Sequence, residues 1–222
     1  MIAPVLTIDG PSGVGKGTVA RVIAQQQDWH LLDSGAIYRA FALAVDSRGV
    51  KVSDESTLVE IAENLDLEFK TQADSELVSV YLDGKDVSKV LRTEQTGEMA
   101  SKIASIGVVR SALLKRQQDF AIAPGLVADG RDMGTVVFEN APFKVYLTAS
   151  SEERANRRLK QLQAQGSEGI MSQILAEVEA RDARDSSRKH SPLKPAKDAL
   201  VIDTTELSLD EVIAQVSELV KA

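Results

Sequence analysis

The chain has 222 residues, of which 43% are hydrophobic and 27% charged, with a net charge of −7 and no cysteine. The length fits one domain or a core domain with inserts, and the acidic balance argues against a nucleic-acid-binding protein, which usually carries a basic surplus. Without cysteine, disulfides and thiolate metal sites are excluded, and without a leader-like start or an apolar run of about 18–20 residues we expect a cytoplasmic protein that does not enter membranes.

Short apolar runs alternate with helical patterns along most of the chain. Strands are expected at 5–9, 29–33, 126–129, 144–149 and 199–204. Helices are expected at 16–27, 34–47, 57–64, 93–120, from 150 onward, at 168–184 and at 208–220. This alternation is typical of βαβ units, and it predicts an α/β fold with a parallel five-stranded sheet flanked by helices.

The segment 67–88 interrupts this alternation. Apolar and polar residues alternate from Leu77 to Leu82, and Asp83-Gly84 favours a tight turn. We therefore expect a small inserted β subdomain at about 64–90, within a single domain that spans 1–222.

A helical hairpin is expected at about 151–185. Ser150-Ser-Glu-Glu153 has the pattern of a capping box at a helix start. Gln165-Gly166-Ser167 separates the first helical pattern from the second.

The stretch Gly10–Thr18, GPSGVGKGT, follows the first expected strand and opens the first expected helix. It matches most of the pattern G-x-x-x-x-G-K-[ST], whose glycines let backbone N–H groups converge on phosphate oxygens at a helix N-terminus. Lys16 would add a full charge, worth about 4 kcal/mol at ~4 Å and an effective dielectric constant of ~20. The alternative is a glycine-rich turn that occurs by chance, but such a turn would not require a strand directly before it and a helix directly after it. Gly17 stands where Ser or Thr is usual, which weakens any claim that the loop ligates Mg²⁺ through a side chain.

Five stretches occur in a fixed order along the whole chain: TIDGPSGVGKGT, LLDSGAIYRA, VADGRDMGTVVF, SSEERANRR and RDARDSSR. Together they resemble the bacterial cytidylate kinases, a family of P-loop nucleoside monophosphate kinases whose long form has an extra subdomain like that at 64–90. The resemblance implies a P-loop NTPase core with a short helical lid at 151–185. It also implies transfer of the γ-phosphoryl group of ATP, with Mg²⁺, to CMP or dCMP, and a monomeric enzyme.

The resemblance also assigns residues. The loop that binds ATP consists of Gly10, Pro11, Ser12, Gly13, Val14, Gly15, Lys16, Gly17 and Thr18. The residues that bind CMP are Ser34, Arg39, Ser101, Arg110, Arg131, Asp132, Arg181, Asp185 and Arg188. An arginine fork suits a phosphate, and a carboxylate can accept from the N4 amino group of cytosine, whereas uracil has a carbonyl there.

Three residues are the candidates for catalysis: Lys16, Arg157 in the lid, and Asp129 at a strand end, where the acid that holds Mg²⁺ or its water stands in P-loop enzymes. Asp33 is a second acid that could lie near Mg²⁺. A phosphate acceptor is already anionic, because its second pKa is about 6. The chemistry therefore needs no general base, and it would consist of positioning and charge neutralisation.

The residues alone leave plainer alternatives open. Ser34 could only cap a helix, Asp129 could belong to a polar turn, and the arginines at 154–158 and 181–188 could form solvent-exposed ion pairs. Ser101 and Arg110 are nine residues apart, so on one straight helix they would face opposite ways. Either a kink near Gly107 realigns them or one assignment is wrong.

Other functions are weaker candidates. A regulatory GTPase would need an Asn-Lys-x-Asp motif, which the sequence lacks. A nucleotide-binding module without catalysis and a kinase for UMP, AMP or shikimate are further alternatives, and an activity assay distinguishes them from a kinase that acts on CMP.

Overall fold

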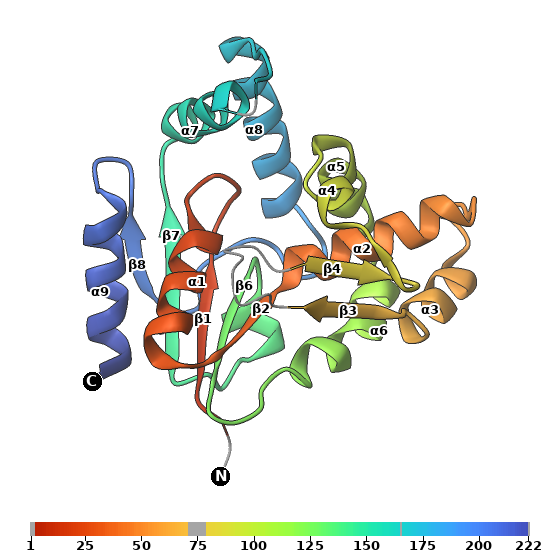
Figure 1. The fold of residues 1–222 in the computed structure, drawn as a ribbon, viewed down its shortest axis with the longest axis horizontal. Helices are drawn as coiled ribbons and strands as arrows, with labels where there is room; N and C mark the ends of the chain where they lie inside the picture. The colour runs from red at the N-terminus through yellow and green to blue at the C-terminus, as the bar shows by residue number, and fades with distance from the viewer. Residues whose placement is uncertain (1–2, 71–78, 165, 222) are drawn as a thin grey trace. The chain divides into compact units, whose positions relative to one another are not determined.

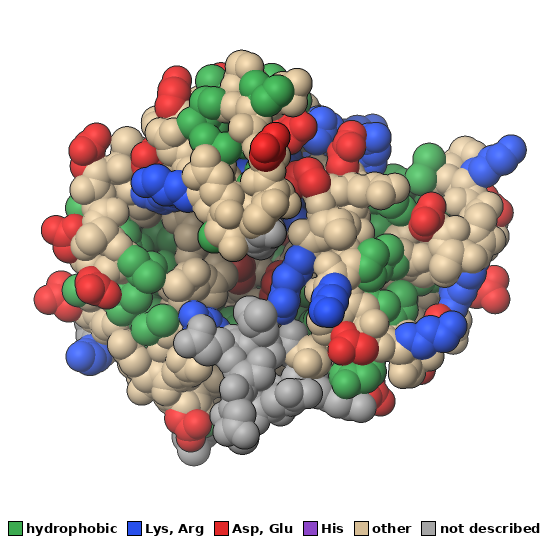
Figure 2. Space-filling view, turned by 45° about the horizontal axis from the view of Figure 1, so that its top comes forward, with side chains coloured by type: hydrophobic (Ala, Val, Ile, Leu, Met, Phe, Trp, Pro, Cys, Tyr) green, Lys and Arg blue, Asp and Glu red, His purple; other side chains and the backbone are tan. Residues whose placement is uncertain are grey.

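The chain folds into two units, which the computed structural model describes over residues 3–70, 79–164 and 166–221. Unit 1 comprises Met1–Asp33 and Gln118–Ala222, and unit 2 comprises Ser34–Gln117. Figure 1 shows the ribbon with its element labels. On the face drawn in Figure 2, Lys and Arg side chains are interspersed with Asp and Glu.

Unit 1 contains a parallel sheet with the strand order β2-β6-β1-β7-β8. Its strands are β1 (Val5–Asp9), β2 (His30–Asp33), β6 (Leu126–Gly130), β7 (Phe143–Thr148) and β8 (Leu200–Asp203). The central strand β1 is buried along its whole length, as expected for a strand covered on both faces. The predicted five-stranded parallel sheet is confirmed.

Helices α1 (Lys16–Gln27) and α9 (Leu209–Lys221) pack side by side in unit 1 (Figure 1). Val19 and Ile23 of α1 and Val212 of α9 join Leu6 and Ile8 of β1 in one buried apolar cluster. This packing fixes the start of α1 against the end of β1, which is where the glycine-rich loop lies.

Two further helices, α7 (Ser151–Ala164) and α8 (Met171–Ser186), form the expected hairpin of unit 1. The hydroxyl of Ser150 accepts from the backbone N–H of Glu153 at 3.1 Å, which is one half of the predicted capping box. The amide of Ser150 donates to the hydroxyl of Thr205 instead of to the side chain of Glu153. A five-residue π-helical turn, η1 (Met133–Val137), follows β6 and was not predicted.

Unit 2 contains the helices α2 (Ser34–Ser47), α3 (Glu55–Glu63), α4 (Ser88–Leu91), α5 (Glu94–Ile103) and α6 (Gly107–Gln118), the last residue of which belongs to unit 1. It also contains an antiparallel sheet of β3 (Leu67–Lys70), β4 (Ser79–Leu82) and β5 (Lys85–Asp86). The turn at Asp83 and Gly84 has positive φ at both residues, 48° and 71°, as a type I′ hairpin requires. The strand expected at Leu77 and Val78 lies outside the described residues.

The single helix expected over 93–120 is wrong. The chain leaves α5 at Ala104 and starts α6 at Gly107, and the amides of Ser105 and Ile106 close tight turns onto Lys102 and Ile103. The break is therefore where a kink was considered. No helix in the described ranges is both long and apolar enough to cross a membrane.

Candidate active site

The loop from Gly10 to Gly15 joins β1 to α1 in unit 1. A Cβ atom at Gly10 would lie only 2.1 Å from the carbonyl oxygen of Leu147 in β7, and Gly10 has a φ of 148°, so a side chain is excluded there. Helix α1, which is described throughout, has Gly15 as its N-cap, so it has no side-chain cap, and it has no acidic residue in its first turn. The positive end of its dipole is therefore not neutralised by a side chain of the helix itself, which suits an anion.

Lys16 is the first residue of α1 and is buried, with 6% of its surface exposed. Its Nζ donates to the carbonyl oxygen of Pro11 at 2.7 Å. Burial lowers the pKa of Lys16 to about 7, and the positive charges of Arg131 and Arg181 add to this, while Asp129 and Asp9 oppose it. A bound polyphosphate would reverse this shift, because it brings the negative charge that the buried ammonium needs.

Two carboxylates lie at neighbouring strand ends of unit 1. Asp33 of β2 and Asp129 of β6 are register partners in the parallel ladder. Burial raises the pKa of Asp129 to about 6; Lys16 opposes the rise and the negative charge of Asp33 adds to it. Among the described residues, no cluster of three His, Cys, Asp or Glu side chains could hold a metal alone. The pair nevertheless fits Mg²⁺, which proteins bind through one or two carboxylates together with substrate phosphates.

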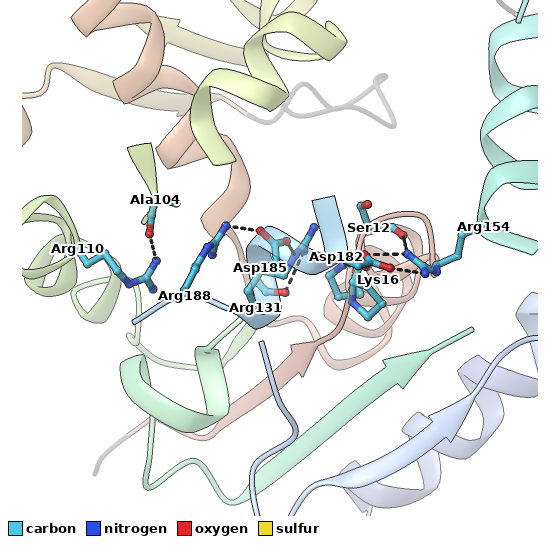
Figure 3. Close-up of polar contacts among 11 residues, drawn as sticks. Ser12, Lys16, Ala104, Arg110, Arg131, Arg154, Asp182, Asp185 and Arg188 are labelled. Carbon is cyan, nitrogen blue, oxygen red and sulfur yellow. Dashed lines mark hydrogen bonds and ion pairs between the residues drawn. The ribbon is translucent and has the colours of Figure 1, made fainter. Parts of the chain in front are cut away.

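Asp185 of α8 is almost fully buried, with 1% of its surface exposed, and lies among arginines. Its Oδ2 accepts from Nε of Arg131 at 3.1 Å, and its Oδ1 pairs with Arg188 (Figure 3). Burial raises the pKa of Asp185, but the positive charges of Arg131, Arg188 and Arg181 outweigh burial. The pKa of Asp185 is therefore below 3.8, the ordinary value for an aspartate. The arginine face at 181–188 is therefore built around a buried carboxylate and is not a solvent-exposed lattice of ion pairs.

Asp185→Asn should lower the free energy of unfolding by about 3 kcal/mol at neutral pH, because removing one partner of a buried ion pair leaves the other charges uncompensated. A depressed pKa stabilises the fold above the ordinary pKa of 3.8, and this contribution is lost as the pH falls below it. The effect of Asp185→Asn should therefore shrink below that pH. Urea unfolding followed by circular dichroism measures it.

The matched control for Asp185→Asn is Glu179→Gln, which removes an exposed carboxylate from the same helix. This control should change the free energy of unfolding by less than about 0.5 kcal/mol. Equal effects of the two substitutions would contradict a stabilising role for the buried charge.

The segment after β6 contains Arg131 and Asp132, and the buried carboxylate of Asp9 holds it in place. Asp132 is 2% exposed and precedes η1. The two carboxylate oxygens of Asp9 accept from the backbone N–H groups of Met133 and Gly134, each at 2.8 Å. Burial raises the pKa of Asp9 to about 7, although the same two hydrogen bonds lower it. Asp9 was missed in the sequence, where it looks like the polar end of an apolar strand.

In unit 2, Ser34 and Arg39 belong to α2. The hydroxyl of Ser34 donates to Gln117 at 2.7 Å. Arg39 Nη1 donates to the carbonyl oxygens of Leu91 at 2.6 Å and Thr93 at 3.0 Å. The guanidinium is thus held by backbone carbonyl oxygens between the last residue of α4 and the N-cap of α5.

Ser101 and Arg110 lie on different helices of unit 2, α5 and α6, and both are buried. Arg110 reaches back across the break, where its Nη1 donates to the carbonyl oxygen of Ala104 at 3.0 Å (Figure 3) and its guanidinium carbon lies 5.4 Å from the centre of the Tyr38 ring. The break between α5 and α6 therefore removes the objection that both residues sit on one straight helix. Their contact with a base stays a prediction.

Comparison with known proteins decides the family. The family model for cytidylate kinase matches residues 6–222. The cytidylate kinase of Photobacterium profundum is 55% identical over 96% of this chain and 92% of its own length. Those of Aeromonas hydrophila and Pseudomonas fluorescens are 55% and 53% identical over 97% of this chain and over 93% and 94% of their own lengths. The chain belongs to the cytidylate kinase family.

In this member of the cytidylate kinase family, the arginines of α7 have separate partners. Arg157 donates from Nε to Glu153 at 2.9 Å, and its Nη atoms donate to Thr204, at 3.1 Å to the hydroxyl and 2.6 Å to the carbonyl oxygen. It is therefore held at the end of β8, and its catalytic role stays a prediction. Arg154, which the sequence analysis passed over in favour of Arg157, contacts the glycine-rich loop through the carbonyl oxygen of Ser12.

Proposed function

We propose that this chain is a kinase that transfers the γ-phosphoryl group of ATP to CMP or dCMP, giving CDP or dCDP and ADP. The observation that carries the proposal is the buried Lys16 behind a glycine-rich loop, in a chain of the cytidylate kinase family. The proposal includes a monomeric enzyme of the cytoplasm that needs neither nucleic acid nor membrane.

The donor is assigned to unit 1. The amides of Gly10–Thr18 and the ammonium of Lys16 hold the phosphates of ATP. Mg²⁺, when bound, would neutralise charge on the phosphate oxygens, and Asp33 and Asp129 are the carboxylates suited to hold it or its water. Arg157 would leave Thr204 to reach the transferring group when the α7–α8 hairpin closes and excludes water.

The acceptor is assigned to the residues that the family resemblance gives it. Arg131, Arg181 and Arg188 would bind its phosphate, and Asp185 its ribose, because guanidinium forks match phosphate oxygens. Asp132 would accept from the cytosine amino group. The resemblance also assigns Ser34, Arg39, Ser101 and Arg110 to the nucleotide. The acceptor oxygen is anionic above about pH 6, so these residues need only bind and orient it.

The test is a panel of acceptors with Mg-ATP, scored by chromatography of the products. CMP and dCMP should be phosphorylated, with turnover far above that of UMP, AMP or shikimate. Faster turnover of one of those three would overturn the acceptor assignment. ATP bound without any phosphorylated product would favour a module without catalysis.

A further inference from the structure

Arg154, in the first turn of α7, links three segments of unit 1 that are far apart in the sequence. Only 4% of its surface is exposed. Nε donates to the carbonyl oxygen of Ala149 at 3.1 Å, and Nη1 donates to that of Ser12 in the glycine-rich loop at 3.2 Å. Both Nη atoms pair with the carboxylate of Asp182 on α8, at 3.0 and 2.5 Å (Figure 3).

These contacts indicate what Arg154 does. Arginine has five N–H donors, and four hydrogen bonds to protein atoms engage four of them. Its guanidinium is therefore largely committed to the protein, so it is poorly placed to bind phosphate. A role in shaping its neighbours fits this arrangement better.

The stem of Arg154 packs against the loop as well. A Cβ atom at Gly13 would lie 3.1 Å from Cβ of Arg154, and Gly13 has a φ of 81°. A side chain at Gly13 would thus be strained and would press on Arg154. Arg154 therefore bonds to the carbonyl of Ser12 and leaves little room for a side chain at Gly13.

Holding the carbonyl of Ser12 also orients the next amide. The peptide bond is planar and trans, so the N–H of Gly13 points opposite to the carbonyl of Ser12. Because that carbonyl points to Arg154, the N–H of Gly13 points away from it. Loss of the guanidinium would let this peptide rotate and would misalign one of the amides that the loop offers to phosphate.

We propose that Arg154 is a positioning residue for the triphosphate donor: it fixes the Ser12–Gly13 peptide of the loop, and Asp182 fixes Arg154. The proposal rests on the proposed function for the identity of the donor. It also ties α7 and α8 to the shape of the loop, since Arg154 of α7 bonds both to Ser12 of the loop and to Asp182 of α8.

The test uses the full chain with Arg154→Met, Arg154→Lys, Asp182→Asn and the double variant Arg154→Met with Asp182→Asn. Two variants serve as controls: Lys160→Met removes an exposed cation from α7, and Glu179→Gln removes an exposed carboxylate from α8. The Kd of ATP without acceptor is measured by calorimetry, and the KM of ATP and of CMP by steady-state kinetics.

Arg154→Met should raise the Kd and KM of ATP about tenfold and leave the KM of CMP within about twofold, a tenfold change being about 1.4 kcal/mol. Arg154→Lys should be intermediate, because a lysine can reach the Ser12 carbonyl or Asp182 but lacks the fork that spans both. Asp182→Asn should weaken ATP binding less than Arg154→Met. The double variant should bind ATP no worse than Arg154→Met, because Asp182 acts through Arg154.

An ATP Kd near that of the wild type in Arg154→Met would overturn the proposal, and so would a KM for CMP that rises as much as that for ATP. If Arg154→Met fails to fold by circular dichroism, Arg154→Lys and Asp182→Asn decide the same question. Failure of the proposed function is distinguishable, because a wild-type chain that binds ATP but does not phosphorylate CMP still yields the ATP Kd of every variant.

Discussion

Lys16→Ala and Lys16→Met should each reduce kcat about 10³-fold while the fold stays intact. A unit charge at ~4 Å from a phosphate is worth about 4 kcal/mol at an effective dielectric constant of ~20, and each 1.36 kcal/mol is about tenfold in rate. Methionine fills the buried space that alanine would leave empty, so it separates the lost charge from lost packing. Steady-state turnover of CMP with Mg-ATP measures the effect.

The stability of the Lys16 variants is a second part of this prediction. Burial lowers the pKa of Lys16 from 10.5 to about 7, so the folded state holds its proton less tightly than the unfolded state. Between these two values the unfolded state binds more protons, and wild-type stability should gain from this residue as the pH rises. Lys16→Met should lack this gain and should be no less stable than the wild type at neutral pH.

Lys160→Met is the control for Lys16, because it removes an exposed cation of the same type from α7. It should leave both turnover and unfolding near the wild-type values. Near-normal turnover by Lys16→Met would contradict the role of the ammonium, whereas loss of turnover together with loss of folded structure would contradict the claim that the fold is intact.

The five-stranded sheet and the helices α1 and α2 could be predicted because their side-chain pattern repeats with the period of their secondary structure. The bounds of α1 and α2 agree with the sequence prediction at both ends. A kink near Gly107 was considered, but the end of one helix and the start of another could not be predicted, because helix-forming residues continue on both sides. The turns that the amides of Ser105 and Ile106 close, and the bond from Arg110 back to Ala104, are seen only in the structure.

The parts of the candidate site that could not be predicted depend on contacts between distant segments. Arg154 and Arg157 have similar sequence contexts. Arg154 bonds to Ser12 and Arg157 to Thr204 because of where the loop and the end of β8 lie in the fold, which the sequence does not show. The turn η1 contains Thr135-Val136-Val137, residues that favour strands. The carboxylate of Asp9, 124 residues earlier in the chain than Met133, holds its first amides instead.

Asp132→Asn should reduce the preference for CMP over UMP, expressed as the ratio of kcat/KM values, by about 10²-fold or more. A site that hydrogen-bonds a substrate group can reject an analogue by about 10⁴-fold, because the buried polar group is left unpaired. Asp132 is 2% exposed, so water has little access to its carboxylate. As a carboxylate it only accepts, which suits the cytosine amino group and repels the carbonyl of uracil.

Asparagine in place of Asp132 would offer both a donor and an acceptor, so it should accept either base, with weaker binding of CMP and better binding of UMP. Asp9 holds the amides that follow residue 132, so the backbone should stay in place and the change should be confined to the base. Kinetics with CMP, dCMP and UMP measure it, with the exposed Glu139→Gln as the control. If Asp132→Asn lowers kcat/KM equally for CMP and UMP, the carboxylate supports the site without reading the base, and the prediction is contradicted.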